Sequence, residues 1–128
     1  MTEAATILLV DDNEDARVTV ARILDMSGYR VIQAPNGKVA ATLLKEQTPD
    51  LVITDIFMPE GDGFDVLSAL REREKPIPVI AISGGGSHNG LDVLGTAQRM
   101  GAVKVLYKPF ARRLLLDTVA EALGDTAG

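Results

Sequence analysis

The sequence predicts an α/β fold, a parallel β-sheet covered by helices on both faces. Five short apolar segments alternate along the chain with segments in which apolar residues recur at helical spacing. This alternation is typical of parallel strands joined by right-handed helical crossovers. The strand segments are almost continuously apolar, as strands buried on both faces require. With 128 residues the chain has the length of one domain, and we assign residues 1–128 to it.

Turn-forming residues bound each of the predicted strands. Pro59 and the glycines after it prevent the third strand from continuing, and Lys108-Pro109 ends the fifth. The fourth strand enters at Pro76 and Pro78 and runs through Ile82. The other four are Thr6–Val10, Arg30–Ala34, Leu51–Thr54 and Val103–Tyr107.

Helical spacing predicts a helix after each strand, with breaking or capping residues at its ends. The expected helices run from the acidic segment 11–15 to about Ser27, from Pro35-Asn36-Gly37 to before Pro49, from Phe64 to near Lys75, from Leu91 to Met100, and from the residues after Pro109 to Gly124. In the last one, Leu114, Leu115 and Leu116 cannot all face inward. We therefore expect at least one of these leucines to be exposed, in a partner or dimer face or as an isolated surface residue.

Composition excludes several classes of function. A net charge of −5 and 4% aromatic residues disfavour direct binding of nucleic acid. The chain has no cysteine, which fits the cytoplasm and leaves no thiolate metal site. Its N-terminus lacks the pattern of a signal peptide, and no apolar run is long enough to insert in a membrane. We therefore expect a cytoplasmic protein.

Polar side chains stand where the apolar strands end. Asp11 and Asp12 follow the first strand, Asp55 the third, Ser83 the fourth and Lys108 the fifth. The carboxyl ends of parallel strands meet at one edge of a sheet, so we expect these side chains to converge. Three carboxylates suit Mg²⁺, a lysine and a hydroxyl can hold phosphoryl oxygens, and a carboxylate can be the nucleophile. Taken alone, Asp55 would be interpreted as a helix cap or a loop residue. The complete set of polar residues at the strand ends favours magnesium-assisted phosphoryl transfer to an aspartate.

The ordered set resembles the receiver domain of two-component response regulators. The matching motifs are Asp11-Asp12, Asp55 with Met58-Pro59, Ser83, and Lys108-Pro109-Phe110; weaker matches are Ala34-Pro35-Asn36-Gly37, Asp62-Gly63-Phe64 and Gly101-Ala102. The resemblance extends over nearly the whole chain. It implies a doubly wound, flavodoxin-like sheet with strand order 2-1-3-4-5.

The resemblance also implies a mechanism. Asp55 would accept a phosphoryl group from a phosphohistidine on a histidine kinase or a histidine phosphotransfer protein. Asp12 would bind Mg²⁺ directly and Asp11 through water, with Asp55 and the backbone carbonyl of Phe57 completing the site. Lys108 would pair with Asp55 and then with the phosphoryl group.

Resemblance further implies that the Ser83 hydroxyl bonds a phosphoryl oxygen, and that the Lys108-Pro109 peptide bond is cis. The chain departs from the family at Val105, where a tyrosine or phenylalanine is usual. A valine has few rotamers and cannot make the swing of a ring. We therefore expect activation to act on the segment 84–94, which is rich in glycine.

The favoured hypothesis is a single-domain response regulator that catalyses only its own phosphorylation and dephosphorylation. It would signal by binding an unknown downstream protein. Formation of a phosphorylation-dependent dimer is an alternative that the sequence leaves undecided. A magnesium phosphohydrolase of the haloacid dehalogenase type is the main alternative, but it needs an Asp-x-Asp pair and Asp11 and Asp12 are adjacent. A flavodoxin-like cofactor binder is disfavoured because few aromatic residues are present to enclose a flavin.

Overall fold

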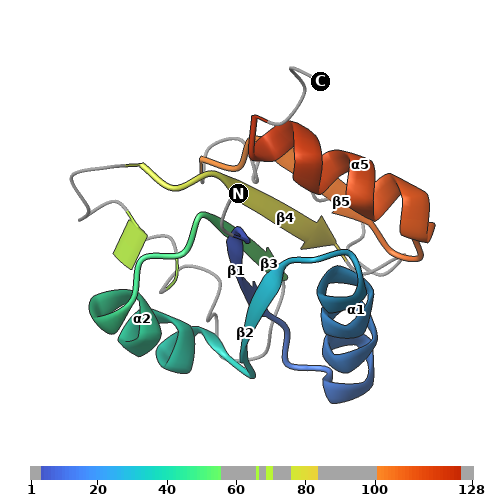
Figure 1. The fold of residues 1–128 in the computed structure, drawn as a ribbon. Helices are drawn as coiled ribbons and strands as arrows, with labels where there is room; N and C mark the ends of the chain where they lie inside the picture. Colours follow the sequence, from blue (N-terminus) through green and yellow to red (C-terminus); the bar gives the residue numbers. More distant parts are fainter. Residues whose placement is uncertain (1–3, 56–65, 67–68, 71–75, 84–100, 125–128) are drawn as a thin grey trace.

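A computed structural model describes residues 4–55, 66, 69–70, 76–83 and 101–124. It contains a five-stranded parallel sheet in the order β2-β1-β3-β4-β5, so the predicted fold class and strand order are confirmed (Figure 1). The strands are β1 (Thr6–Val10), β2 (Arg30–Ala34), β3 (Leu51–Asp55), β4 (Val79–Ser83) and β5 (Lys104–Tyr107).

Burial along the strands follows their place in the sheet. Every residue of the interior strands β3 and β4 is buried, whereas the edge strands β2 and β5 each contain two exposed residues. The register pairs Val10 with Thr54 and Ser83 with Tyr107. The carboxyl ends of the interior strands therefore lie side by side at one edge.

Helices cover both faces of this sheet. They are α1 (Glu14–Met26), α2 (Gly37–Glu46) and α5 (Arg112–Ala122). Two asparagines cap the first two helices: Asn13 Oδ1 accepts from the Ala16 amide at 2.9 Å, and Asn36 Oδ1 accepts from the Val39 amide at 2.9 Å. Of the predicted third helix, residues 66, 69 and 70 are described and helical, and the predicted fourth helix lies outside the described residues.

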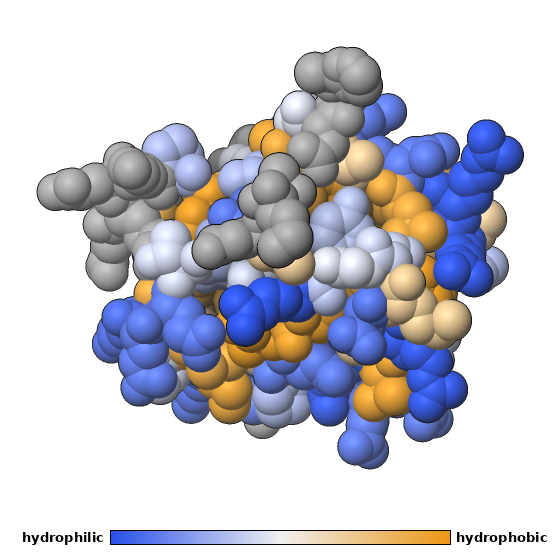
Figure 2. All heavy atoms as spheres, in the orientation of Figure 1, coloured by the Kyte–Doolittle hydropathy of each residue, from blue (hydrophilic) through white to orange (hydrophobic). Residues whose placement is uncertain are grey.

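Two apolar clusters hold the layers together. Successive strand residues point to opposite faces, so Ile7 and Leu9 of β1 join one cluster and Leu8 and Val10 the other. The first cluster packs α1 and α5 against one face of the sheet. The second cluster packs α2, Val66 and Leu70 against the other face. Figure 1 shows α1 and α5 on one side of the sheet and α2 on the other. Hydrophilic residues lie over the outer sides of α2 and α5 in Figure 2.

The observed boundaries differ from the predicted ones at three strands. Asp55 and Ser83 are the last residues of β3 and β4 rather than the first residues beyond them, because each continues the pairing with the neighbouring strand. β5 begins at Lys104, and Val103 precedes it with 55% of its surface exposed. Edge strands gain less from burial, and their ends are correspondingly harder to predict.

The prediction for the leucines of α5 is confirmed. Leu115 is fully buried, whereas Leu114 is 51% exposed. None of the helices in the described part of the chain has the length and apolar character that a membrane span requires.

Candidate functional site

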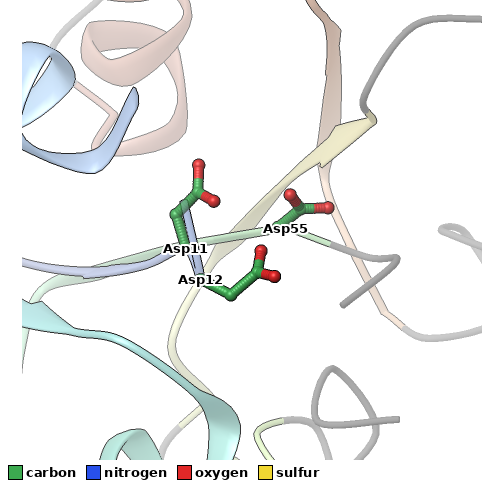
Figure 3. A group of neighbouring side chains, drawn as sticks. All are labelled: Asp11, Asp12 and Asp55. Atoms are coloured by element: carbon green, nitrogen blue, oxygen red, sulfur yellow. The ribbon is translucent and has the colours of Figure 1, made fainter. Parts of the chain in front are cut away.

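Three aspartates gather where the strand order reverses, between β1 and β3. Asp11 and Asp12 follow β1, and Asp55 ends β3 (Figure 3). Each offers one carboxylate oxygen, and the three oxygens lie within 4.8 Å of one another. Ligand sites of open α/β sheets lie at such a reversal, beyond the carboxyl ends of the strands. Hard divalent cations prefer carboxylate oxygens, so this donor set fits Mg²⁺.

Asp11 is held by partners on every polar atom. Its amide donates to the carbonyl of Ala34 at 3.2 Å, and its own carbonyl accepts from Arg17 Nη1 at 2.9 Å. Its Oδ1 accepts from the amide of Asn13 at 2.9 Å, and its Oδ2 accepts from Lys108 Nζ at 3.0 Å. Asp11 is 2% exposed. These bonds fix the position of its carboxylate and occupy one site on each oxygen.

Asp12 contrasts with its neighbour. Its side chain is exposed and has no hydrogen bond or ion pair within the described residues. In Figure 3 it extends from the end of β1 toward Asp55. Asp12 is therefore the member of the cluster whose carboxylate has the fewest bonds to give up before it binds a cation directly.

Lys108 brings a positively charged side chain to the three aspartates. Its Nζ lies 3.0 Å from Asp11 Oδ2 and 3.6 Å from Asp55 Oδ2, so it stands nearer to Asp11 than to Asp55. The backbone amide of Lys108 donates to the carbonyl of Ser83 at 2.8 Å, which extends the β4–β5 ladder by one residue. The Lys108-Pro109 peptide bond is cis, as the resemblance implies.

The surroundings of Lys108 act on its charge in opposite senses. Burial lowers the pKa of the ammonium group, but hydrogen bonding to Asp11 and the attraction of Asp11 and Asp55 outweigh it, and the pKa is raised above its ordinary value of 10.5. The lysine is therefore charged at neutral pH and neutralises part of the acidic cluster.

The raised pKa predicts a pH dependence of stability. A raised folded-state pKa contributes stability that is fully present below the ordinary value and is lost as the pH rises through the folded value. We expect the difference in unfolding free energy between the wild type and Lys108→Met to be constant at pH values well below 10.5 and to shrink as the pH rises above 10.5. Urea unfolding in metal-free buffer measures it, with Lys104→Met as the control. A difference that stays constant as the pH rises above 10.5 would contradict the prediction.

Ser83 completes the part of the predicted site that the structure describes. It is 3% exposed, ends β4, and pairs in register with Tyr107 of β5. The structure thus places the predicted residues of four strand ends at one edge of the sheet. Phe57, Met58-Pro59 and the segment 84–94 lie outside the described residues, so the role of the Phe57 carbonyl and the expected movement of that segment stay predictions.

Sequence reasoning missed Arg17. This residue lies in the first turns of α1, where an arginine is usually solvated, yet it bonds the backbone of Asp11 and, at 3.2 Å, Gln33 Oε1. Long side chains on a helix point back toward its N-terminus. That direction, applied to a helix that starts beside the Asp11-Asp12 pair, is the signal that could have found it.

Together, the fold and the cluster define a doubly wound α/β protein with a lysine-neutralised acidic site at its strand reversal. Residues 7–120 match the family model described as the response regulator receiver domain. The chain belongs to this family, whose members are phosphorylated on an aspartate in two-component signalling.

Relatives of known name and structure agree with this assignment. Sporulation initiation phosphotransferase F of Bacillus subtilis is 31% identical over 117 residues, which cover 91% of this chain and 92% of that protein. The C4-dicarboxylate transport transcriptional regulatory protein DctD of Pseudomonas aeruginosa is 35% identical over 91% of this chain and 25% of its own length. A response regulator receiver protein from Burkholderia phymatum superposes with a TM-score of 0.81 and 30% identity, covering 94% of this chain and 95% of that one. The chain spans about a quarter or less of the length of the first curated relatives that it matches.

Proposed function

We propose that Asp55 accepts a phosphoryl group from a phosphohistidine on a histidine kinase or a histidine phosphotransfer protein. The observation that carries the proposal is the convergence of three carboxylates within 4.8 Å, with the Lys108 ammonium group 3.6 Å from Asp55 Oδ2. A carboxylate oxygen of Asp55 attacks phosphorus, and the new O–P bond forms as the P–N bond breaks. The electron pair of that bond leaves with the imidazole nitrogen.

Each neighbouring residue has a role in this transfer. Asp11, Asp12, Asp55 and the backbone carbonyl of Phe57 would hold Mg²⁺, which offsets the charge of the phosphoryl oxygens when bound. Lys108 and the Ser83 hydroxyl would bind those oxygens and stabilise the charge that develops on them. Asp11 serves mainly to anchor Lys108 and the backbone, since its oxygens already have protein partners.

The wider role that we propose is phosphorylation-dependent binding of a downstream protein. Residues 1–128 act as one receiver domain, in the cytoplasm where ATP-dependent kinases supply the phosphohistidine, without direct contact to nucleic acid. The only catalysis is the protein's own phosphorylation and dephosphorylation.

Incubation with a small phosphodonor tests the proposal. Intact-mass measurement should show the gain of one phosphoryl group in the presence of Mg²⁺ and none after complete chelation. A gain that persists without metal, or no gain with it, overturns the proposal. Turnover of a generic phosphomonoester would instead favour the phosphohydrolase, against which the adjacency of Asp11 and Asp12 already argues.

Asp12→Ala should weaken Mg²⁺ binding more than Asp11→Ala. Asp12 is exposed and its carboxylate has no partner within the described residues, whereas both Asp11 oxygens accept hydrogen bonds. We expect a loss of at least about tenfold for Asp12→Ala and a smaller one for Asp11→Ala. Calorimetric titration with Mg²⁺ measures both, and Asp15→Ala in α1 controls for the loss of a nearby exposed carboxylate. Equal losses at Asp11 and Asp12 would refute the ranking.

A further inference from the structure

Arg17 lies beside the acidic cluster without belonging to it. Its Nη1 donates to the carbonyl of Asp11 at 2.9 Å, and its Nε donates to Gln33 Oε1 on β2 at 3.2 Å. A guanidinium group is planar and donates in fixed directions, so two bonds from one group restrict its orientation. The Arg17 side chain thereby links α1, β2 and the segment that leaves β1.

The hydrogen bond from Arg17 to the Asp11 carbonyl also restricts the backbone of Asp12. The carbonyl of Asp11 and the amide nitrogen of Asp12 belong to one planar peptide unit. A bond that holds this carbonyl oxygen therefore also fixes the plane from which the Cα and the side chain of Asp12 extend. The Asp12 carboxylate has no hydrogen-bond partner within the described residues, so its backbone is what orients it.

We propose that Arg17 is a positioning residue of the cation site, which holds the Asp11–Asp12 peptide so that the Asp12 carboxylate is directed toward Asp55. This inference rests on the proposed function, because it concerns Mg²⁺ at Asp11, Asp12 and Asp55. In this role Arg17 would act through the backbone carbonyl of Asp11 and not as a ligand of the cation.

Replacement of Arg17 has two opposite effects on the affinity for Mg²⁺, one from its charge and one from its hydrogen bond. Loss of a positive charge beside three carboxylates raises the affinity for a cation, although solvent and salt weaken this effect. Loss of the hydrogen bond frees the Asp12 peptide and lowers the affinity. Loss of a residue that orients a metal ligand typically lowers metal affinity by about 10- to 100-fold. We therefore expect Arg17→Gln to weaken Mg²⁺ binding about tenfold, although the loss of positive charge alone would strengthen it.

Three further variants, compared with Arg17→Gln, separate the two effects. Arg22→Gln removes an exposed arginine of the same helix, and its Mg²⁺ affinity should be unchanged or slightly higher. Gln33→Ala keeps the charge of Arg17 but removes its second anchor, and should lose less affinity than Arg17→Gln. Arg17→Lys keeps the charge and one donor for the Asp11 carbonyl, and should recover part of the loss.

Calorimetric titration of the full chain with Mg²⁺ is the measurement. The Asp12 amide resonance of metal-free Arg17→Gln should also shift from its wild-type position. Affinity of Arg17→Gln equal to or higher than that of Arg22→Gln overturns the inference. If Arg17→Gln does not fold, Gln33→Ala decides, since wild-type affinity in that variant also overturns it. A wild-type chain without Mg²⁺ affinity would instead refute the cation site itself.

Discussion

Asp55→Asn should abolish phosphorylation by a small phosphodonor. The amide has nearly the shape of the carboxylate, so the fold and the contacts of β3 are retained. Its oxygen carries no formal charge and is a poor nucleophile, and the substitution removes one of the three carboxylates of the cluster. Intact-mass measurement after incubation with donor and Mg²⁺ should show no gain at all, where the wild type gains one phosphoryl group.

The matched control is Asp25→Asn, which changes an exposed aspartate of α1 and should leave phosphorylation unchanged. Reaction of the wild-type product with hydroxylamine should remove the phosphoryl group, because an aspartyl phosphate is an acyl phosphate. Persistence of the mass gain in Asp55→Asn would show that another residue is the acceptor and would remove Asp55 from the mechanism.

The fold could be predicted because its pattern is local. β3 and β4 are buried at every residue, and such strands appear in the sequence as unbroken apolar runs between turn formers. The edge strand β5 was predicted one residue too long at its start, since Val103 is apolar but 55% exposed. Apolar character alone cannot distinguish a strand residue from an exposed one at the edge of a sheet.

The site was predictable as a set of residues but not as a network. Parallel strands bring their carboxyl ends together, which placed Asp11, Asp55 and Lys108 at one edge. The shorter contact of Lys108 to Asp11, 3.0 Å against 3.6 Å to Asp55, depends on side-chain geometry that no spacing encodes. The bond from Arg17 to a backbone carbonyl was missed for the same reason.

Lys108→Met should slow phosphorylation by about a hundredfold, the effect typical of removing one donor that stabilises developing charge. Methionine keeps most of the length of the side chain and removes only the ammonium group. Without it, the phosphoryl oxygens lose a cation that stands 3.6 Å from the attacking carboxylate. Lys104→Met is the matched control, because Lys104 begins β5, the strand that Lys108 follows, and pairs with the exposed Glu121 at 2.9 Å.

The same substitution should strengthen the binding of Mg²⁺. In the wild type, the Lys108 ammonium group already neutralises Asp11 Oδ2 and competes with a divalent cation for the cluster. Its removal leaves two carboxylates that are 3% and 8% exposed without their positive partner, and we expect the Mg²⁺ affinity to rise by about tenfold. Titration of Lys108→Met and Lys104→Met with Mg²⁺, beside their phosphorylation rates, separates the two roles. Slower phosphorylation with tighter Mg²⁺ binding would show that Lys108 serves the phosphoryl group and opposes the metal. A fall in both would mean that the lysine instead organises the carboxylates for the cation.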